Sequence, residues 1–352
     1  MASLIGVRGK ARAELSVRLV TSIWHAPPPA KRSAPFDDIH VIGVAGHIRA
    51  CIRRYDAHLL HASHKRDIQG KNRSARLRVV CACDPSLAPN QRLGFHMTTL
   101  RGKTIVVTGA SSGIGYAAAK LFAQEGANVV LAARRQAPLD AVVDEIQGAG
   151  GKAVAIAGDV RDEQLAKALV EIAVGHFGGL DAAFNNAGAV GQMGPVPEIS
   201  LAGWQEAIEV NLTGAFLGAK YQLPAMIERG GGSLIFTSSF VGNTVGFPGM
   251  AAYAAAKAGV VGLVRVLAAE YGAKGVRANA ILAGGTDTTM NLANMPDAAP
   301  ETRTYIENLH ALKRLAAPEE IARAALFLAS DASSFVTGTA MQVDGGVSIT
   351  RG

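Results

Sequence analysis

The sequence predicts an α/β fold, with a parallel sheet of seven strands and helices on both faces. Short apolar runs alternate with longer segments of helical period, which is typical of βαβ units. A glycine-rich turn joins the first of these strands to the helix after it. Residues 97–352 are long enough for a single domain with a large core. We therefore predict one folded domain at 97–352, preceded by an extension at 1–96.

The apolar runs give the strands in order along the chain. We expect them at 104–108, 128–132, 153–157, 181–185, 233–237, 276–282 and 340–343. The first strand is followed by a helix with an apolar face of Ala117, Ala118, Leu121 and Phe122. Residues 250–271 form another predicted helix, and its many alanines and glycines favour close packing on the sheet or on a neighbouring helix.

The turn after the first strand predicts a phosphate site. Gly109, Gly113 and Gly115 follow Thr108 with the spacing G-x-x-x-G-x-G. Glycine allows a tight turn and a close approach of the backbone to a pyrophosphate. The pyrophosphate would then meet the N–H groups and the positive dipole end of the following helix.

Tyr253 and Lys257 lie four residues apart in a predicted helix, so they share one face with Cβ atoms roughly 5–6 Å apart. A phenol with an ordinary pKa of about 10 exchanges protons poorly at neutral pH. We expect the lysine charge to favour phenolate and to lower the pKa of Tyr253. A core tyrosine and a solvated lysine are the structural alternative.

With these motifs in place, residues from about Met97 to Gly352 resemble the short-chain dehydrogenase/reductase family. The motifs that carry the resemblance occur in the family's order: T-G-x-x-x-G-x-G at 108–115, Asp159-Val160, N-N-A-G at 185–188, Asn211, Ser239 with Tyr253 and Lys257, and Val343-Asp344-Gly345-Gly346. The resemblance implies a Rossmann-type doubly wound fold and an NAD(P)(H)-dependent oxidoreductase that interconverts a carbonyl and an alcohol.

The resemblance also implies catalytic roles. Tyr253 would be the general acid and base, and Lys257 would lower its pKa and bind the nicotinamide ribose. Ser239 would hydrogen-bond the substrate oxygen, with Ser238 as a strand-end residue. Asn211 would help to connect the lysine to a water relay. Ser239 lies one position further from Tyr253 than is usual in the family, which implies one extra residue in the loop 240–252.

The cofactor-binding residues implied by the family are Thr108, Gly109, Ser111, Ser112, Gly113, Ile114, Gly115, Arg134, Arg135, Asp159, Val160, Asn186, Ala187, Gly188, Tyr253, Lys257, Gly284, Thr286 and Thr288. NAD-preferring members usually have Asp where this sequence has Ala133, and Arg134 offers a guanidinium to a 2′-phosphate. This favours NADP(H), with NAD(H) as the alternative. Asp159 would touch the adenine or cap a helix that begins near Arg161.

The family closes its substrate pocket with a mobile lid, here at about Ala283–Leu315. Ser239, Phe240, Phe247 and Met290 are the candidate substrate contacts. The small polar and apolar groups fit a neutral ketone, aldehyde or alcohol, with a 3-oxoacyl thioester or a sugar-like polyol among the candidates. The alternative function is a regulatory or ligand-sequestering protein that binds dinucleotide with little turnover.

The extension 1–96 differs in composition from the rest of the chain. It has 16 Lys and Arg against six acidic residues, whereas 97–352 has 19 against 22. Three interpretations compete: a disordered tail, a targeting peptide, and upstream sequence before a true start at Met97. A polyanion-binding tail is the weaker expectation, so nucleic acid is not an expected partner.

All three cysteines, Cys51, Cys81 and Cys83, lie in the extension without the spacing of a zinc site, and no metal is expected. A catalytic domain without cysteine fits a cytoplasmic enzyme. We expect no apolar run of membrane-spanning length. Family members commonly form tetramers through long helices, here at about 202–229 and 250–272, which implies a homo-oligomer, a tetramer or a dimer.

Overall fold

The computed structural model describes residues 99–296 and 298–350. The chain divides after Gly94, and every described residue belongs to the unit Phe95–Gly352. The expectations for the extension, for its cysteines and for a start at Met97 concern residues outside the described ranges.

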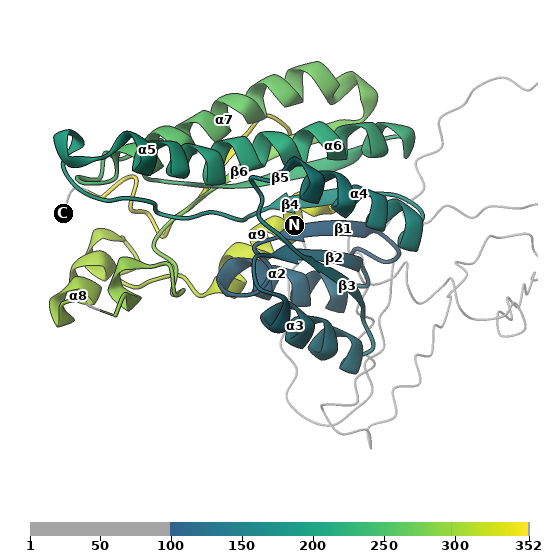
Figure 1. Cartoon of the computed structure of the whole chain (residues 1–352), viewed down its shortest axis with the longest axis horizontal. Helices are drawn as coiled ribbons and strands as arrows, with labels where there is room; N and C mark the ends of the chain where they lie inside the picture. Colours follow the sequence, from purple (N-terminus) through teal and green to yellow (C-terminus); the bar gives the residue numbers. More distant parts are fainter. Residues whose placement is uncertain (1–98, 297, 351–352) are drawn as a thin grey trace, which may run out of the picture. The chain divides into compact units, whose positions relative to one another are not determined.

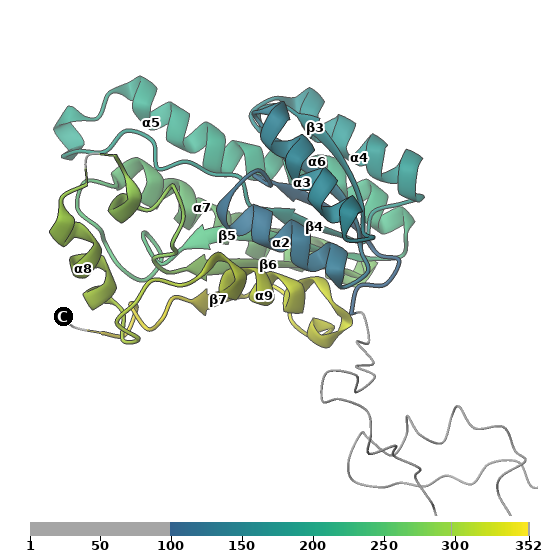
Figure 2. The same cartoon turned by 90° about the horizontal axis from the view of Figure 1, so that it is seen from below.

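The described residues form a seven-stranded sheet in the order β3-β2-β1-β4-β5-β6-β7 (Figures 1 and 2). Every neighbouring pair of strands is parallel. The bounds are β1 Thr104–Thr108, β2 Asn128–Ala133, β3 Lys152–Ala157, β4 Ala182–Asn185, β5 Gly232–Ser239, β6 Val276–Ala283 and β7 Ala340–Val343. The predicted fold class is confirmed, and each strand lies where its apolar run predicts it.

Helices cover both faces of this sheet because successive strand residues point to opposite sides. Ile105 and Val107 of β1 pack toward one helix layer, and Val106 between them packs toward the other. The first layer contains α2 Gly113–Gln124, α3 Gln136–Gly148 and α9 Pro318–Ala329. The second contains α4 Glu163–Phe177, α6 Gly214–Glu228 and α7 Ala251–Tyr271, with α5 Leu201–Ile208 packed on α7.

The predicted long helix at 202–229 is interrupted. Between α5 and α6 the residues Glu209–Thr213 form a π-helical turn that contains the buried Asn211. The Asn211 amide donates to the carbonyl of Ala207 at 2.9 Å and to that of Ala189, outside the helix, at 2.8 Å. A π turn inside a longer helix often marks a functional position.

The helix α7 corrects the expectation that the sequence contains no apolar run of membrane-spanning length. Within Ala251–Lys274, an 18-residue window has a mean hydropathy of 1.5, so by length and composition alone this helix could cross a membrane. In the fold their apolar character has another use, because Val260, Val261 and Val264 are buried in the core beside β5 and β6. A helix that buries one apolar face in the core passes the same hydropathy test.

The strand order places a crevice at the carboxyl ends of β1 and β4. The chain runs outward from β1 to β3 and then returns to β4 on the other side of β1. Ligands of doubly wound sheets bind at such a switch point. The predicted lid follows β6 and contains α8 Pro300–Leu309, which lies beyond the carboxyl ends of the strands (Figure 2).

Candidate active site

The glycine turn between β1 and α2 has the conformation that its sequence predicts. Gly109 has φ +68° and Gly113 has φ +55°, a region that strains other residues. A Cβ on Gly115 would lie 2.2 Å from the carbonyl oxygen of Gly109. The backbone therefore passes close to itself here, and only glycine fits.

The amino end of α2 presents backbone N–H groups toward this crevice. Ser112 is the N-cap in extended conformation, its side chain makes no capping hydrogen bond, and the first turn has no acidic residue. Ser111 and Ile114, also predicted to bind cofactor, lie on either side of it. Such a helix end attracts an anionic group, and a pyrophosphate fits it.

Asn186 ties this turn to the neighbouring strands. The hydroxyl of Thr108 accepts from the backbone N–H groups of Asn186 at 3.0 Å and Ala187 at 3.1 Å. The Asn186 amide donates to the Thr108 carbonyl at 3.1 Å and accepts from the Thr237 hydroxyl at 3.0 Å. The predicted segment 186–188 is therefore held against the ends of both β1 and β5.

Ser239 and Tyr253 meet at the end of β5. Both are almost fully buried, and the Ser239 hydroxyl lies close enough to Tyr253 to lower the pKa of the phenol. Lys257 follows Tyr253 by one helical turn, with Nζ 5.6 Å from the centroid of the tyrosine ring. Its ammonium donates to the carbonyl of Thr237 at 2.8 Å. The three predicted catalytic side chains are thus adjacent, although two elements supply them.

Burial controls the acidity of this pair. It raises the pKa of the Tyr253 phenol above its ordinary 10.0, and the neighbouring Ser239 hydroxyl offsets this rise only in part. It lowers the pKa of Lys257 from 10.5 to about 8. From the sequence we expected Lys257 to lower the pKa of Tyr253. The net shift of this pKa is upward, because the loss of water around the phenol has the largest effect.

Asn211 reaches the same site from the π turn. A Cβ on Gly188 would lie 2.7 Å from the Asn211 side-chain oxygen and 3.2 Å from Lys257 Nζ. The Asn211 oxygen accepts from the backbone N–H of Ala189 at 3.2 Å. The structure therefore brings the lysine, the asparagine and the N-N-A-G segment together around one glycine.

Ser238 and Ser239 point in different directions. The Ser238 hydroxyl donates to the Lys257 carbonyl at 2.8 Å and accepts from Asn243 Nδ2 at 3.1 Å. It joins β5 to α7, whereas the Ser239 hydroxyl accepts from the Val241 N–H at 3.1 Å and lies beside Tyr253. This supports the choice of Ser239 as the serine that faces a substrate.

Arg134 and Arg135 are exposed just after β2. The pKa of the Asp159 carboxyl is lowered, mainly by its hydrogen bond with the Arg161 side chain. The charge of Arg134 lowers the same pKa by a smaller amount. The Asp159 carboxylate accepts from Arg161 Nη2 at 2.8 Å. The capping alternative for Asp159 is wrong, because α4 begins at Glu163 and Asp162 is its N-cap. Val160 follows Asp159 in the same turn.

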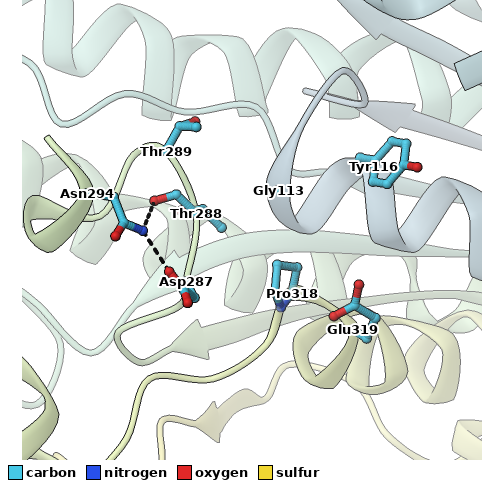
Figure 3. A pocket seen from close by; sticks show the side chains of 8 residues that line it. All are labelled: Gly113, Tyr116, Asp287, Thr288, Thr289, Asn294, Pro318 and Glu319. Atoms are coloured by element: carbon cyan, nitrogen blue, oxygen red, sulfur yellow. Dashed lines mark hydrogen bonds between the residues drawn. The ribbon is translucent and has the colours of Figure 1, made fainter. Parts of the chain in front are cut away.

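The segment after β6 lies against the glycine turn. A Cβ on Gly113 would lie 2.9 Å from Thr288 Cγ2. A cavity of about 370 Å³ opens beside this contact, lined by Gly113, Tyr116, Asp287, Thr288, Thr289, Asn294, Pro318 and Glu319 (Figure 3). Asn294 donates to Asp287 at 2.7 Å and to the Thr288 carbonyl at 2.9 Å, which fixes the wall of the cavity.

Gly284 and Thr286, the other predicted cofactor contacts in this segment, lie at its start. Thr286 donates to the Gly284 carbonyl at 3.1 Å. A Cβ on Gly284 would lie 2.7 Å from Asp344 Cα, so the ends of β6 and β7 also approach closely.

Two comparisons with sequences of known proteins bear on this geometry. The model of a family described as enoyl-(acyl carrier protein) reductase matches residues 109–348. A 2,5-dichloro-2,5-cyclohexadiene-1,4-diol dehydrogenase of Sphingobium indicum is 45% identical over 251 residues, which are 71% of this chain and 98% of that protein. A cyclohexanol dehydrogenase of an Acinetobacter species is 41% identical over 243 residues, covering 69% and 94%.

The crystal structure of a short-chain type dehydrogenase/reductase from Mycobacterium marinum matches with a TM-score of 0.67 and 34% identity. The match covers 72% of this chain and 98% of that one. The chain belongs to the short-chain dehydrogenase/reductase family. As a member of that family it is an NAD(P)-dependent oxidoreductase that acts on CH–OH groups of small molecules.

The residues described above fit a nicotinamide dinucleotide, as membership of the short-chain dehydrogenase/reductase family requires. The three glycine positions of the turn at 109–115 leave no room for a side chain, and the amino end of α2 can receive a pyrophosphate. Among the described residues there is no cluster of three or more His, Cys, Asp or Glu that could bind a metal.

The substrate side of this short-chain dehydrogenase/reductase is only partly predictable from its sequence. Phe240 and Phe247, both predicted, pack with Tyr253 in one apolar cluster. Met290 is 42% exposed and lies outside that cluster. Val347, which sequence reasoning missed, is buried in it. It follows the Asp344-Gly345-Gly346 motif, and that position was the available signal.

Proposed function

We propose that this enzyme interconverts a secondary alcohol and a ketone on a ring of modest size, with a preference for NADP(H). The observation that carries the proposal is the burial of Ser239 and Tyr253 next to each other, with Lys257 one helical turn further along. A phenol and a hydroxyl can together hold one substrate oxygen, and the phenol can exchange a proton with it.

In this proposal Tyr253 gives its phenolic proton to the carbonyl oxygen during reduction and takes it back during oxidation. Ser239 donates a hydrogen bond to the same oxygen, on which negative charge develops in the transition state. Lys257 holds a positive charge beside the phenol, and Asn211 fixes the segment that passes over the lysine. The bound nicotinamide supplies or accepts the hydride.

Arg134 supports the preference for NADP(H). It lies one residue beyond Ala133, the position from which an acidic side chain would otherwise bind the ribose hydroxyls and repel a 2′-phosphate. Its guanidinium is exposed and can form a bidentate pair with phosphate. Arg134→Asp should therefore raise the KM for NADPH more than the KM for NADH.

The ring substrate is supported by two separate features. Two relatives more than 40% identical to this chain are dehydrogenases of cyclic alcohols by name. In the described part of this chain, Phe240, Phe247, Met250 and Val347 pack around Tyr253, and such apolar groups favour a neutral hydrocarbon ring over a charged chain.

The test is a spectrophotometric assay at the nicotinamide absorbance. Oxidation of NADPH and of NADH is followed separately with cyclohexanone, substituted cyclohexanones, a polyol-derived ketone and a 3-oxoacyl thioester. We expect the highest kcat/KM for a cyclic ketone with NADPH. A higher kcat/KM for the 3-oxoacyl thioester would overturn the ring assignment. No turnover despite saturable NADPH binding would favour a ligand-sequestering protein.

A further inference from the structure

His310 is the only described titratable side chain in the lid that is almost completely buried, with 1% of its surface exposed. It follows α8 directly. Its Nε2 accepts a hydrogen bond from the backbone N–H of Gly285 at 2.9 Å, and its Nδ1 lies 2.8 Å from the carbonyl oxygen of Ile306.

These two partners fix the protonation of the ring. The Gly285 N–H can only donate, so Nε2 must be without a proton. The Ile306 carbonyl can only accept, so Nδ1 must have the proton. His310 is thus a neutral imidazole that joins the carboxyl end of α8 to the first residues after β6.

The ring also contacts the other walls of the site. It makes an edge-on contact with the Phe240 ring, with centroids 6.4 Å apart. A Cβ on Gly285 would lie 2.8 Å from His310 Cε1, and one on Gly345 would lie 3.3 Å from Cδ2. The imidazole therefore fills the space between the ends of β5, β6 and β7, and both glycines make room for it.

The Gly285 backbone links His310 to the predicted cofactor contacts. The Gly285 carbonyl accepts from the N–H of Ala316, and the Asp287 N–H donates to the Ala316 carbonyl, both at 2.8 Å. This short bridge sets the position of the residues between them. Thr288 comes next and touches the glycine turn at Gly113.

We propose that His310 is a positioning residue: through its Nε2 it holds the Gly285–Thr288 segment in place to bind the nicotinamide cofactor. This rests on the proposed roles of Thr286 and Thr288. The described part of the chain offers the partly buried Gly285 N–H no other partner. Loss of the Nε2 acceptor leaves that donor unpaired and frees the segment to move.

Two substitutions separate the functions of the two ring nitrogens. His310→Gln places an amide oxygen near the position of Nε2, where it can accept from Gly285. His310→Asn places its amide near the position of Nδ1, where it can serve only Ile306. Both remove the ring contact with Phe240, so each is the control for the other.

Affinity for NADPH and NADH is measured by the fluorescence of the bound cofactor, which requires no substrate, and kcat is measured at saturating cofactor. We expect His310→Asn to weaken binding of the preferred cofactor on the order of tenfold, and His310→Gln to weaken it about threefold or less. The kcat of both variants should change less than their cofactor affinity. Equal affinities for the two variants, or a loss confined to kcat, would overturn the proposal.

Hydrogen exchange of the wild-type Gly285 amide provides a test that does not depend on the folding of a variant. We expect NADPH to slow exchange at Gly285, and unchanged exchange at saturating cofactor would contradict the role of His310. If the wild-type protein binds neither cofactor, the proposed function itself fails. If it binds one and both variants bind it equally, only the role of His310 fails.

Discussion

Tyr253, the proposed proton donor, is enclosed by apolar side chains, so its hydroxyl has few groups with which to exchange a proton. The neighbouring polar side chain is Ser239, which lowers the pKa of the phenol. The cluster around its ring contains Phe240, Val241 and Met250. A substrate oxygen that replaced water at this position would meet both hydroxyls and little else that is polar.

Tyr253→Phe keeps the ring and removes the proton. We expect kcat to fall by about 10²–10⁴ in both directions, with NADPH affinity within about threefold of wild type. Tyr271→Phe, in the same helix and away from the site, is the matched control and should retain full activity. A Tyr253→Phe rate close to that of wild type would exclude Tyr253 as the acid and base.

The pH dependence follows from the two shifted groups. Because burial raises the pKa of Tyr253, the phenol stays protonated through the neutral range and is available for ketone reduction. Lys257 holds its charge below about pH 8. Reduction should therefore be flat through neutral pH and fall above about pH 8, while oxidation, which needs phenolate, should rise as the solution becomes alkaline. Measured kcat profiles in both directions test this, and oxidation that slows between neutral and alkaline pH would contradict it.

For single residues, the sequence predicted the site wherever the spacing of residues along the chain determines which groups come together. The i,i+4 spacing of Tyr253 and Lys257 and the glycine turn both predicted positions that the structure brings together. His310 was not predictable in this way. The His310 ring lies between its hydrogen-bond partners Gly285 and Ile306. The sequence around His310 indicates neither that the ring is buried nor which of its nitrogens has the proton.

At the scale of elements, the π turn at Glu209–Thr213 places Asn211 beside the lysine. A π turn contains one extra residue, so it changes the direction of the side chains in and after it. In a regular helix from α5 to α6, the Asn211 side chain would point in another direction. Hydrophobic periodicity could predict a helix at 202–229 but not this insertion, because the apolar pattern on both sides of the turn remains helical. The strands were easier, since buried parallel strands read as continuous apolar runs.

Asn211→Ala should weaken both the fold and the site. The substitution leaves the carbonyls of Ala189 and Ala207 without their amide donor. We expect the free energy of unfolding to fall by about 1–3 kcal/mol, with a lower kcat. Urea unfolding and steady-state kinetics measure the two effects. Gln205→Ala, on the exposed side of α5, is the control, and an equal effect of both substitutions would remove any special role for Asn211.

At the scale of the whole molecule, the outer side of the α5, α6 and α7 layer exposes large apolar side chains. Leu201 is 71% exposed, Phe216 49% and Val266 52%. The helices α5 and α6 follow one another through the π turn, and α5 packs on α7 (Figure 1). Exposed apolar groups gathered on one face are typical of a protein–protein interface. We propose that this layer joins copies of the chain into a dimer or tetramer.

Light scattering after size-exclusion chromatography tests the assembly. We expect a mass of two or four times the chain mass of 36.4 kDa. Phe216→Glu places a charge in the proposed interface and should shift the mass toward that of one chain. Lys167→Glu, on the exposed side of α4, should leave the mass of the assembly unchanged. A wild-type mass of one chain would contradict the proposal.

The packing of α2 on α9 also has a consequence for synthesis of the protein. Ala118 and Phe122 of α2 share a core with Ile321 and Ala325 of α9, so an early helix depends on one of the last. During synthesis of the residues between the two helices, the apolar side of α2 is exposed because α9 does not yet exist. A chain that stops before Pro318 exposes that side and leaves the glycine turn unsupported. We therefore expect prematurely terminated chains to be recognised by proteases, so that cofactor binding is a property of chains completed at least through α9.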